Sequence, residues 1–297
     1  MFKKIDIDSK KILDKYFEMV DYEACEYCFT TLYMWNDVYK SKYYVEKDFA
    51  VMAGEYDKDS FMILPLATGE NIDKAMKFVF NQFVQANKKI HLKAVNKEIV
   101  EYLGEQYPDR FEYIEERDNF DYIYDGESLR TLAGRKNHKK RNHLNSFIKE
   151  FGERTEYKTL EKSDFHDCLN LIKEWEIRKD SDGDELYDDY EAVEKIFSNY
   201  DKLKESIKVG GIYIDSKLQA FSIGEMINKD MAVVHVEKAN ADIRGLYPYI
   251  NQQFLVNEFN DAKLINREED LGIEGLRKAK LSYHPVKLVE KYTVVEK

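Results

Sequence analysis

The sequence has no apolar run long enough to cross a bilayer. A transmembrane helix needs about 18 consecutive apolar residues, whereas the richest run here, Phe61–Ala67, has only the length of a strand. The N-terminus carries lysines but no apolar segment before further charged residues, so no secretory signal is recognisable. The three cysteines, Cys25, Cys28 and Cys168, are too few for a disulfide framework. We therefore expect a cytoplasmic chain without a membrane anchor.

Several motifs that would indicate a particular enzyme class are also missing. The chain has no G-x-S-x-G, no Walker loop and no G-x-G-x-x-G, so hydrolase, P-loop and dinucleotide functions have no support. Cys25-x-x-Cys28 stands without a second pair or paired histidines, which favours structural thiols over zinc. The acidic loop Asp180–Glu185 resembles the start of a calcium loop but lacks the required glutamate spacing. We expect no metal site.

What the chain does have is enough apolar residues for two cores. It has 297 residues, of which 43% are hydrophobic and 14% aromatic, which indicates a globular protein of two domains. The formal charge is −11, and residues 1–127, with 17 basic and 26 acidic side chains, account for most of it. Asp125-Gly-Glu-Ser128 reads as a turn ending in a helix-capping serine, so we place the boundary there. The predicted domains are 1–127 and 128–297.

Hydrophobic periodicity predicts a mixed α+β pattern in both halves, each a twisted mixed sheet flanked by helices. In the first half the expected helices are 9–20, 30–37, 71–86 and 97–103, and the expected strands are 42–45, 49–53, 61–66, 89–92, 111–114 and 120–124. In the second half the expected helices are one that carries an apolar stripe over 144–151 and ends at Gly152, and helices at 163–178, 190–203, 247–259 and 274–280. The expected strands are 154–159, 209–214, 218–226, 231–237, 263–266 and a pair across 286–295.

The sharpest electrostatic feature is a run of five cations in seven residues, Arg135-Lys136-Asn-His-Lys139-Lys140-Arg141. A local cluster can bind a polyanion on an acidic chain, because screening over roughly 8–10 Å makes the nearby charges matter most. The amphipathic stripe that follows places these cations on the first turns of a docked helix. The alternative is a solvated helix face.

Two further segments could carry chemistry. The loop Ala239–Leu246 joins a strand to a helix, where backbone N–H groups, Arg244 and Gly245 could receive an anion, although it could equally be an ordinary connection. The stretch from Asn266 to Lys280 has eight charged side chains at the end of a strand. Among them, Glu268, Asp270, Arg277 and Lys280 could bind an amino acid's ammonium and carbonyl groups, or form a surface turn with ion pairs.

These segments resemble a known family. Leu132–Asn137 with Arg141–Asn145, Ile243–Tyr247, Asn266–Gly272 and Leu276–Tyr283 look like the C-terminal domain of phosphatidylglycerol lysyltransferases and its uncharacterised soluble relatives. The resemblance extends over nearly the whole chain. It implies two tandem GNAT-like acyltransferase domains, similar to the Fem-type peptidoglycan aminoacyltransferases.

The resemblance also implies transfer of an aminoacyl group from an aminoacyl-tRNA to an amine or hydroxyl acceptor, which could be a small molecule, a lipid headgroup or a peptide. Glu268 and Asp270 would then face the substrate amine, and Arg277 and Lys280 its carbonyl or phosphate groups. Arg135, Lys136, Lys139, Lys140 and Arg141 would contact the acceptor stem of the tRNA.

On that topology the acyl group lies where the strand 231–237 splays from the strand 263–266. His235 and Glu237, alternate residues on one face, are the nearest candidates for a base, and each could instead be a structural residue. The loop Asp242–Tyr247 keeps only the first glycine of the usual coenzyme A motif, with Arg244 and Gly245 as the candidate contacts. Two other functions remain open: a transferase that uses acyl-CoA as co-substrate, and a non-catalytic RNA- or ligand-binding protein.

Overall fold

The computed structural model describes residues 1–180 and 189–297, which form two compact units. The first unit is built from three stretches of chain, 1–121, 269–273 and 288–297, and the second from 122–268 and 274–287. The acidic loop that resembles a calcium loop, Asp180–Glu185, lies outside the described residues from position 181 onward.

A mixed sheet forms the centre of the first unit. Its strands run in the order β1-β2-β3-β4-β6-β15-β7, with β5 beside β3. The strands are β1 (Lys3–Lys4), β2 (Lys42–Val45), β3 (Phe49–Tyr56), β4 (Asp59–Ile63), β5 (Leu66–Ala67), β6 (His91–Val95), β7 (Phe111–Glu115) and β15 (Tyr292–Glu296). The helices are α1 (Lys10–Phe17), α2 (Phe29–Met34), α3 (Asn36–Tyr39), α4 (Asn71–Gln85) and α5 (Lys97–Gln106).

The second unit has a sheet in the order β14-β8-β13-β12-β11-β10-β9. Its strands are β8 (Asp121–Asp125), β9 (Thr155–Thr159), β10 (Ile207–Ile214), β11 (Lys217–Met226), β12 (Met231–Ala239), β13 (Leu264–Asn266) and β14 (Lys287–Val289). Its helices are α6 (Gly126–Thr131), α7 (His138–Phe151), α8 (Phe165–Asp180), α9 (Asp189–Ser198), α10 (Tyr200–Leu203), α11 (Leu246–Glu258) and α12 (Glu274–Leu281).

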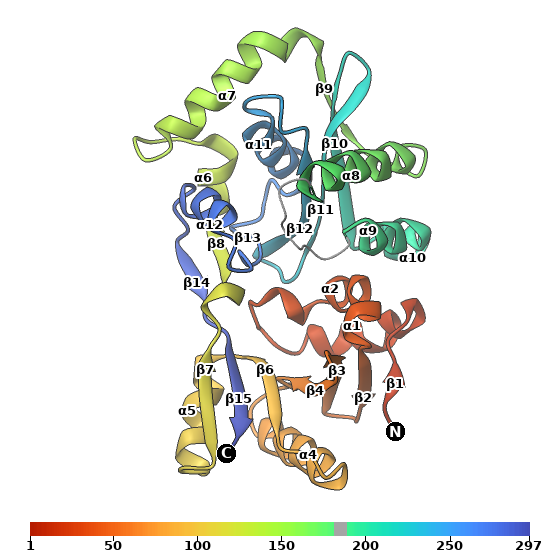
Figure 1. The fold of residues 1–297 in the computed structure, drawn as a ribbon, viewed down its shortest axis with the longest axis vertical. Coiled ribbons are helices and arrows are strands. Elements are labelled where there is room, and N and C mark those ends of the chain that lie inside the picture. The colour runs from red at the N-terminus through yellow and green to blue at the C-terminus, as the bar shows by residue number, and fades with distance from the viewer. Residues whose placement is uncertain (181–188) are drawn as a thin grey trace. The chain divides into compact units, whose positions relative to one another are not determined.

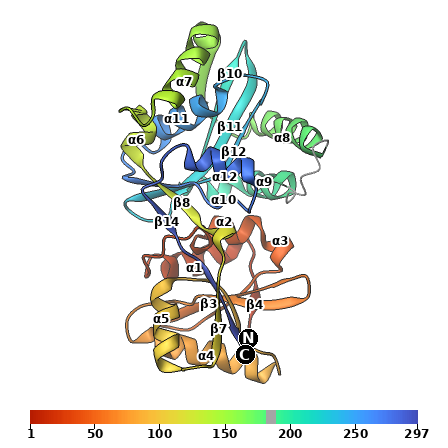
Figure 2. The same ribbon diagram turned by 60° about the vertical axis from the view of Figure 1, so that its left-hand side comes forward.

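Helices cover both faces of the second sheet, with α11 and α7 on one side and α8 on the other (Figure 2). Two neighbouring residues of β12 contact helices on opposite faces of the sheet, because successive side chains of a strand point to opposite faces. Glu237 accepts a hydrogen bond from Asn251 of α11, whereas the Lys238 ammonium lies 3.4 Å from the ring centre of Trp175 on α8.

The largest difference from the sequence prediction concerns the last strands. We expected a strand pair across 286–295, and this is wrong, because β14 belongs to the second sheet and β15 to the first. β15 lies between β6 and β7 and pairs antiparallel with both (Figure 1). A short β-branched segment such as Tyr-Thr-Val-Val-Glu carries no mark of its distant partners.

The boundary between the units also differs from the predicted one. The first unit ends its opening stretch at Asp121 rather than at 127, and it takes back 269–273 and 288–297. Ser128 is not the helix cap. Asp125 caps α6 by accepting a hydrogen bond from the Ser128 N–H at 2.7 Å, since a carboxylate three residues upstream reaches the first free N–H groups of a helix. Gly152 follows α7 with right-handed backbone angles and begins a short 3-10 turn.

Within the described ranges, no helix combines the length and the apolar character that crossing a membrane requires.

Candidate functional site

The polar centre of the second unit lies beside β12, beyond the end of the short strand β13. β12 and β13 pair from Met231 with Leu264 to Val233 with Asn266, which is the last residue of β13. β12 continues to Ala239, so its last six residues have no partner in β13. They keep their pairing with β11.

His235 is an extra residue in β12 at this point. The register with β11 passes from Val236 opposite Ile223 to Val234 opposite Gly224, which leaves His235 as a β-bulge. A bulge re-aims its side chain relative to the regular pleat. The ring of His235 is fully buried between two carboxylates, with Nδ1 2.9 Å from Glu268 Oε1 and Nε2 3.1 Å from Glu225 Oε1.

The two contacts define the chemistry of His235. An ionised carboxylate only accepts hydrogen bonds, and a neutral imidazole donates through one nitrogen alone. With both carboxylates ionised, only the imidazolium satisfies both contacts. His235 is then a proton donor and a fixed positive charge. Of the three side chains, that of Glu268 is the most accessible, at 21% exposed, against 7% for Glu225.

A second buried ion pair lies on the face of the sheet that α11 covers. The β11 register puts Glu225, the partner of His235, on the opposite face, so the expectation that His235 and Glu237 share one face is wrong. Arg267, the residue after β13, places Nη2 2.9 Å from Glu237 Oε1, and Asn251 of α11 donates to Glu237 Oε2 at 2.9 Å. The Arg267 and Glu237 side chains are 13% and 10% exposed. The guanidinium carbon lies 4.9 Å from the ring centre of Tyr283 and 5.8 Å from that of Tyr124.

The basic run divides into cations that face solvent and cations that face the protein. Arg135, Lys136 and Lys139 are exposed. Arg141 instead donates to the carbonyl oxygens of Leu132 and Gly134, the latter at 2.9 Å. Lys140 extends over Tyr283, with its ammonium 4.0 Å from the ring centre. Successive helical residues are rotated by about 100°, so Lys139 and Lys140 face different surroundings.

The position of Lys140 changes its acidity. Burial, followed by repulsion from Arg267, lowers the pKa of the Lys140 ammonium to about 8, against a weaker attraction from Glu237. A low-dielectric surrounding disfavours the charged form of an amine. At neutral to mildly alkaline pH, Lys140 is thus a mixture of amine and ammonium.

The other predicted residues of the C-terminal third are dispersed. The buried Lys280 donates from Nζ to the carbonyl of Arg267, which supports the turn after β13, and Arg277 is partly buried on α12. Asp270 belongs to the first unit, where it is fully buried and pairs with Arg117 at 3.3 Å. The structure therefore groups Glu268 with His235 in one unit and assigns Asp270 to the other.

Gly245 and Arg244 stand at the start of α11. Gly245 has φ +87°, and a Cβ there would lie 2.4 Å from the backbone oxygen of His143 on α7. Arg244 is exposed, and its Nε lies 3.4 Å from His143 Nδ1. The close approach that we expected for an anion is thus made by α7, and the glycine permits the two helices to meet.

Replacing Gly245 by alanine is expected to lower the free energy of unfolding by about 1–3 kcal/mol from backbone strain alone, with a further loss because the Cβ displaces α7. Gly275 is the matched control, since it lies in α12 with open space around its Cα. Gly275→Ala should be neutral or stabilising by up to about 1 kcal/mol. Urea denaturation measures both, and equal stability of the two variants would contradict this packing role.

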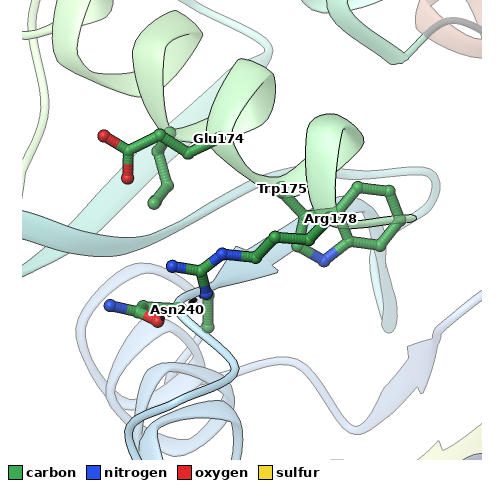
Figure 3. Close-up of a pocket in the computed structure, with 6 residues that line it drawn as sticks. Glu174, Trp175, Arg178 and Asn240 are labelled. Atoms are coloured by element: carbon green, nitrogen blue, oxygen red, sulfur yellow. Dashed lines mark hydrogen bonds between the residues drawn. The ribbon is translucent and has the colours of Figure 1, made fainter. Parts of the chain in front are cut away.

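A small hollow lies beside the same loop on the other face of the sheet (Figure 3). Arg178 of α8 points toward Asn240, donates to its Oδ1 at 3.0 Å and pairs with Asp242 at 3.0 Å. Trp175 donates from its ring nitrogen to the Tyr247 hydroxyl at 3.1 Å. These contacts fix the loop before α11 with the protein's own side chains.

The first unit contains a separate buried ionic cluster. The Lys291 ammonium, 2% exposed, lies 2.7 Å from Asp121 and 2.8 Å from Glu26, and 3.5 Å from the Cys25 sulfur. Burial, then the charge of Asp121, raises the pKa of the Cys25 thiol, so it stays protonated. Cys25, Glu26 and Asp121 are close enough to share a metal ion, but Lys291 already supplies a positive charge to both carboxylates. Cys28 is also buried, in keeping with structural thiols.

The family model described as phosphatidylglycerol lysyltransferase, C-terminal, matches residues 17–295. A conserved protein of unknown function from Bacteroides thetaiotaomicron is 31% identical in sequence, with a TM-score of 0.93 over 100% of this chain and 99% of that one. An uncharacterized protein of Mycoplasmoides gallisepticum is 25% identical over 178 residues, which are 58% of this chain and 55% of that protein. The chain thus matches about half the length of that curated relative.

Two more distant structures share the fold. L-PGS from Bacillus licheniformis is 12% identical, with a TM-score of 0.65 over 99% of this chain and 92% of that one. FemX is 9% identical, with a TM-score of 0.64 over 99% and 96%. The predicted α+β fold of two tandem GNAT-like domains, each with a mixed sheet flanked by helices, is confirmed.

Proposed function

Because the chain belongs to the phosphatidylglycerol lysyltransferase C-terminal family, we propose that it transfers an aminoacyl group from an aminoacyl-tRNA to an amine or hydroxyl acceptor. The observation that carries this proposal is the pair of buried ionic contacts made by β12 with the residues after β13, His235 with Glu268 and Glu237 with Arg267. This is the place at which the family's topology puts the acyl group.

The reaction asks little covalent help from the protein. The bond between the carbonyl carbon and the ester oxygen of the donor breaks, a bond to the acceptor nitrogen or oxygen forms, and the acceptor's proton moves to a base. The protein supplies position, a base and a donor to the oxyanion. While its ring donates to both carboxylates, His235 cannot serve as that base. We assign the role to Glu268, the accessible carboxylate that His235 orients.

The exposed cations near α7 support binding of the tRNA that carries the aminoacyl group. Arg135 and Lys136 lie just before α7 and Lys139 lies in its first turn. All three are exposed, and we propose that they contact tRNA phosphates. Such contacts release counterions, so the affinity falls as salt rises. Arg141, which donates to the carbonyl oxygens of Leu132 and Gly134, would add little to this term.

The test is filter binding of the full chain to aminoacylated and deacylated bulk tRNA across a salt series, with coenzyme A present or absent. Replacing Arg135, Lys136 and Lys139 together by alanine should weaken binding and reduce the slope of log affinity against log salt by about one per cation. The control triple, Lys149→Ala, Lys204→Ala and Lys208→Ala, removes exposed cations elsewhere in the same unit and should leave the slope unchanged.

Preference for the aminoacylated tRNA, unaffected by coenzyme A, supports aminoacyl transfer. No tRNA binding at low salt overturns the proposal and leaves the acyl-CoA enzyme. Equal binding of both tRNAs with no release of the amino acid to any acceptor would instead indicate a binding protein.

A further inference from the structure

The second unit contains two cations beside one tyrosine ring and a single carboxylate to balance them. The Lys140 ammonium lies 4.0 Å and the Arg267 guanidinium carbon 4.9 Å from the centre of Tyr283. The two cations are thus at most about 9 Å apart. Arg267 pairs with Glu237 at 2.9 Å. Lys140 has no carboxylate at ion-pair distance among the residues that the structure describes.

Arg267 also has a hydrogen-bond donor to spare. Nη2 holds Glu237, and the guanidinium also interacts with the Tyr283 hydroxyl. Its Nη1 is nevertheless buried and makes no hydrogen bond of normal geometry within the described part of the chain. A buried N–H group without a partner is costly, and native proteins satisfy nearly all of them. A guanidinium has a planar fork that suits phosphate and carboxylate oxygens. A ligand oxyanion would satisfy Nη1 and neutralise the excess positive charge.

We propose that Arg267 Nη1 and Lys140 Nζ, beside Tyr283, form an oxyanion-binding subsite for a phosphate group of the substrate. The groups that face Lys140 are Lys139 of its own helix, Glu237 of β12, Arg267 after β13 and the ring of Tyr283 after α12. Of these, only Glu237 carries a negative charge, because burial raises the pKa of Tyr283 to about 12 and keeps the phenol neutral. The role of the phosphate as part of a substrate rests on the proposed function, whereas the binding of the anion does not.

When an anion binds at the subsite, Lys140 takes up a proton. A bound dianion favours the ammonium form of Lys140, so the pKa of Lys140, about 8 in the free protein, rises on binding. At pH 8 about half of the Lys140 side chains are neutral before binding and nearly all are charged afterwards. Binding of one anion should therefore take up about half a proton, and the affinity should fall as the pH rises above 8.

The experiment uses sulfate as the probe, because sulfate does not titrate near pH 8 and any proton uptake then belongs to the protein. Sulfate is titrated into the full chain at constant ionic strength, by calorimetry at pH 8 in two buffers of different ionisation enthalpy. We expect uptake of about half a proton. Lys140→Met should abolish the uptake and weaken sulfate binding roughly tenfold or more. Lys149→Met, which removes an exposed lysine of the same helix, should change neither.

Sulfate binding without proton uptake, equal effects of the two lysine variants, or no binding at tens of millimolar sulfate would each overturn the subsite. Two phosphate monoesters then identify its source in the substrate. Adenosine monophosphate represents the terminal nucleotide of a tRNA, glycerol phosphate represents an acceptor without a base, and a preference for either supports the subsite.

The outcome is separable from that of the proposed function. A chain that binds sulfate through Lys140 but transfers no aminoacyl group keeps the subsite and loses the function. A chain that transfers the aminoacyl group but takes up no proton with sulfate keeps the function and loses the subsite.

Discussion

Lys291→Met is expected to lower the free energy of unfolding by about 3–5 kcal/mol, because removing one partner of a buried ion pair leaves the other charge buried without compensation. Asp121 is fully buried and Lys291 only 2% exposed, with 2.7 Å between them. The lysine also holds Glu26 at 2.8 Å. Urea denaturation followed by circular dichroism measures the loss.

The loss should depend on pH in a defined direction. Burial already raises the pKa of the Glu26 carboxyl against the opposing charge of Lys291, and the variant removes that opposing charge, so the pKa rises further. The folded state then binds more protons than the unfolded state, so its stability falls as the pH rises toward this pKa. The deficit of Lys291→Met should be largest near pH 7 and smaller near pH 4.

Two companion variants test the cause. Lys89→Met removes an exposed lysine of the same unit and should change the stability by no more than about 0.5 kcal/mol. Lys291→Met combined with Asp121→Asn removes the uncompensated charge and should recover part of the loss. A deficit below about 1 kcal/mol at pH 7, or one that does not vary with pH, would show that the cluster carries little net energy.

Arg267→Met is the counterpart in the second unit, with an expected loss of about 3–5 kcal/mol for the same physical reason. Glu237, only 10% exposed, would keep the Asn251 amide as its hydrogen-bond donor but lose the cation. The contacts of the guanidinium with Tyr283 and Tyr124 would be replaced by a thioether of smaller reach. Sulfate binding should be lost with it.

Arg267→Lys separates charge from geometry. A lysine keeps the positive charge for Glu237 but offers no planar fork, so most of the stability should remain while sulfate affinity falls. Arg267→Met combined with Glu237→Gln should recover part of the stability without recovering sulfate binding. If Arg267→Met unfolds at the same urea concentration as the unchanged protein, the pair is not a structural support of β12 and β13.

Several residues of the site were not predicted from the sequence, because no local motif distinguishes any of them from other polar residues. Glu225 is one more charged residue near the end of a strand, and Asn251 is a single polar residue in a helix. Arg267 lies within the charged segment after β13 but resembles its neighbours. Only the fold reveals that Glu225 contacts His235, and that Asn251 and Arg267 meet at Glu237.

For the basic run, the sequence pattern predicts the helix but not the surroundings of each lysine. The stripe of apolar residues correctly predicts a docked helix after it, and α7 covers His138–Phe151. The same pattern cannot separate Lys139 from Lys140, since the two differ only in the direction in which each leaves the helix. Lys140 is partly buried and has a lowered pKa, and it lies against Tyr283, which is 143 residues later in the chain.

The sequence by itself determined the local elements and the fold class, because helical and strand periods are written in neighbouring residues. It also located the two parallel strands of the second unit, expected at 231–237 and 263–266 and found at Met231–Ala239 and Leu264–Asn266. The tertiary structure alone decided that β15 enters the first sheet, that Asp270 and Glu268 belong to different units, and that Lys291 is buried among carboxylates. Strand pairing and burial of charge depend on partners far away in the chain, and no local pattern records them.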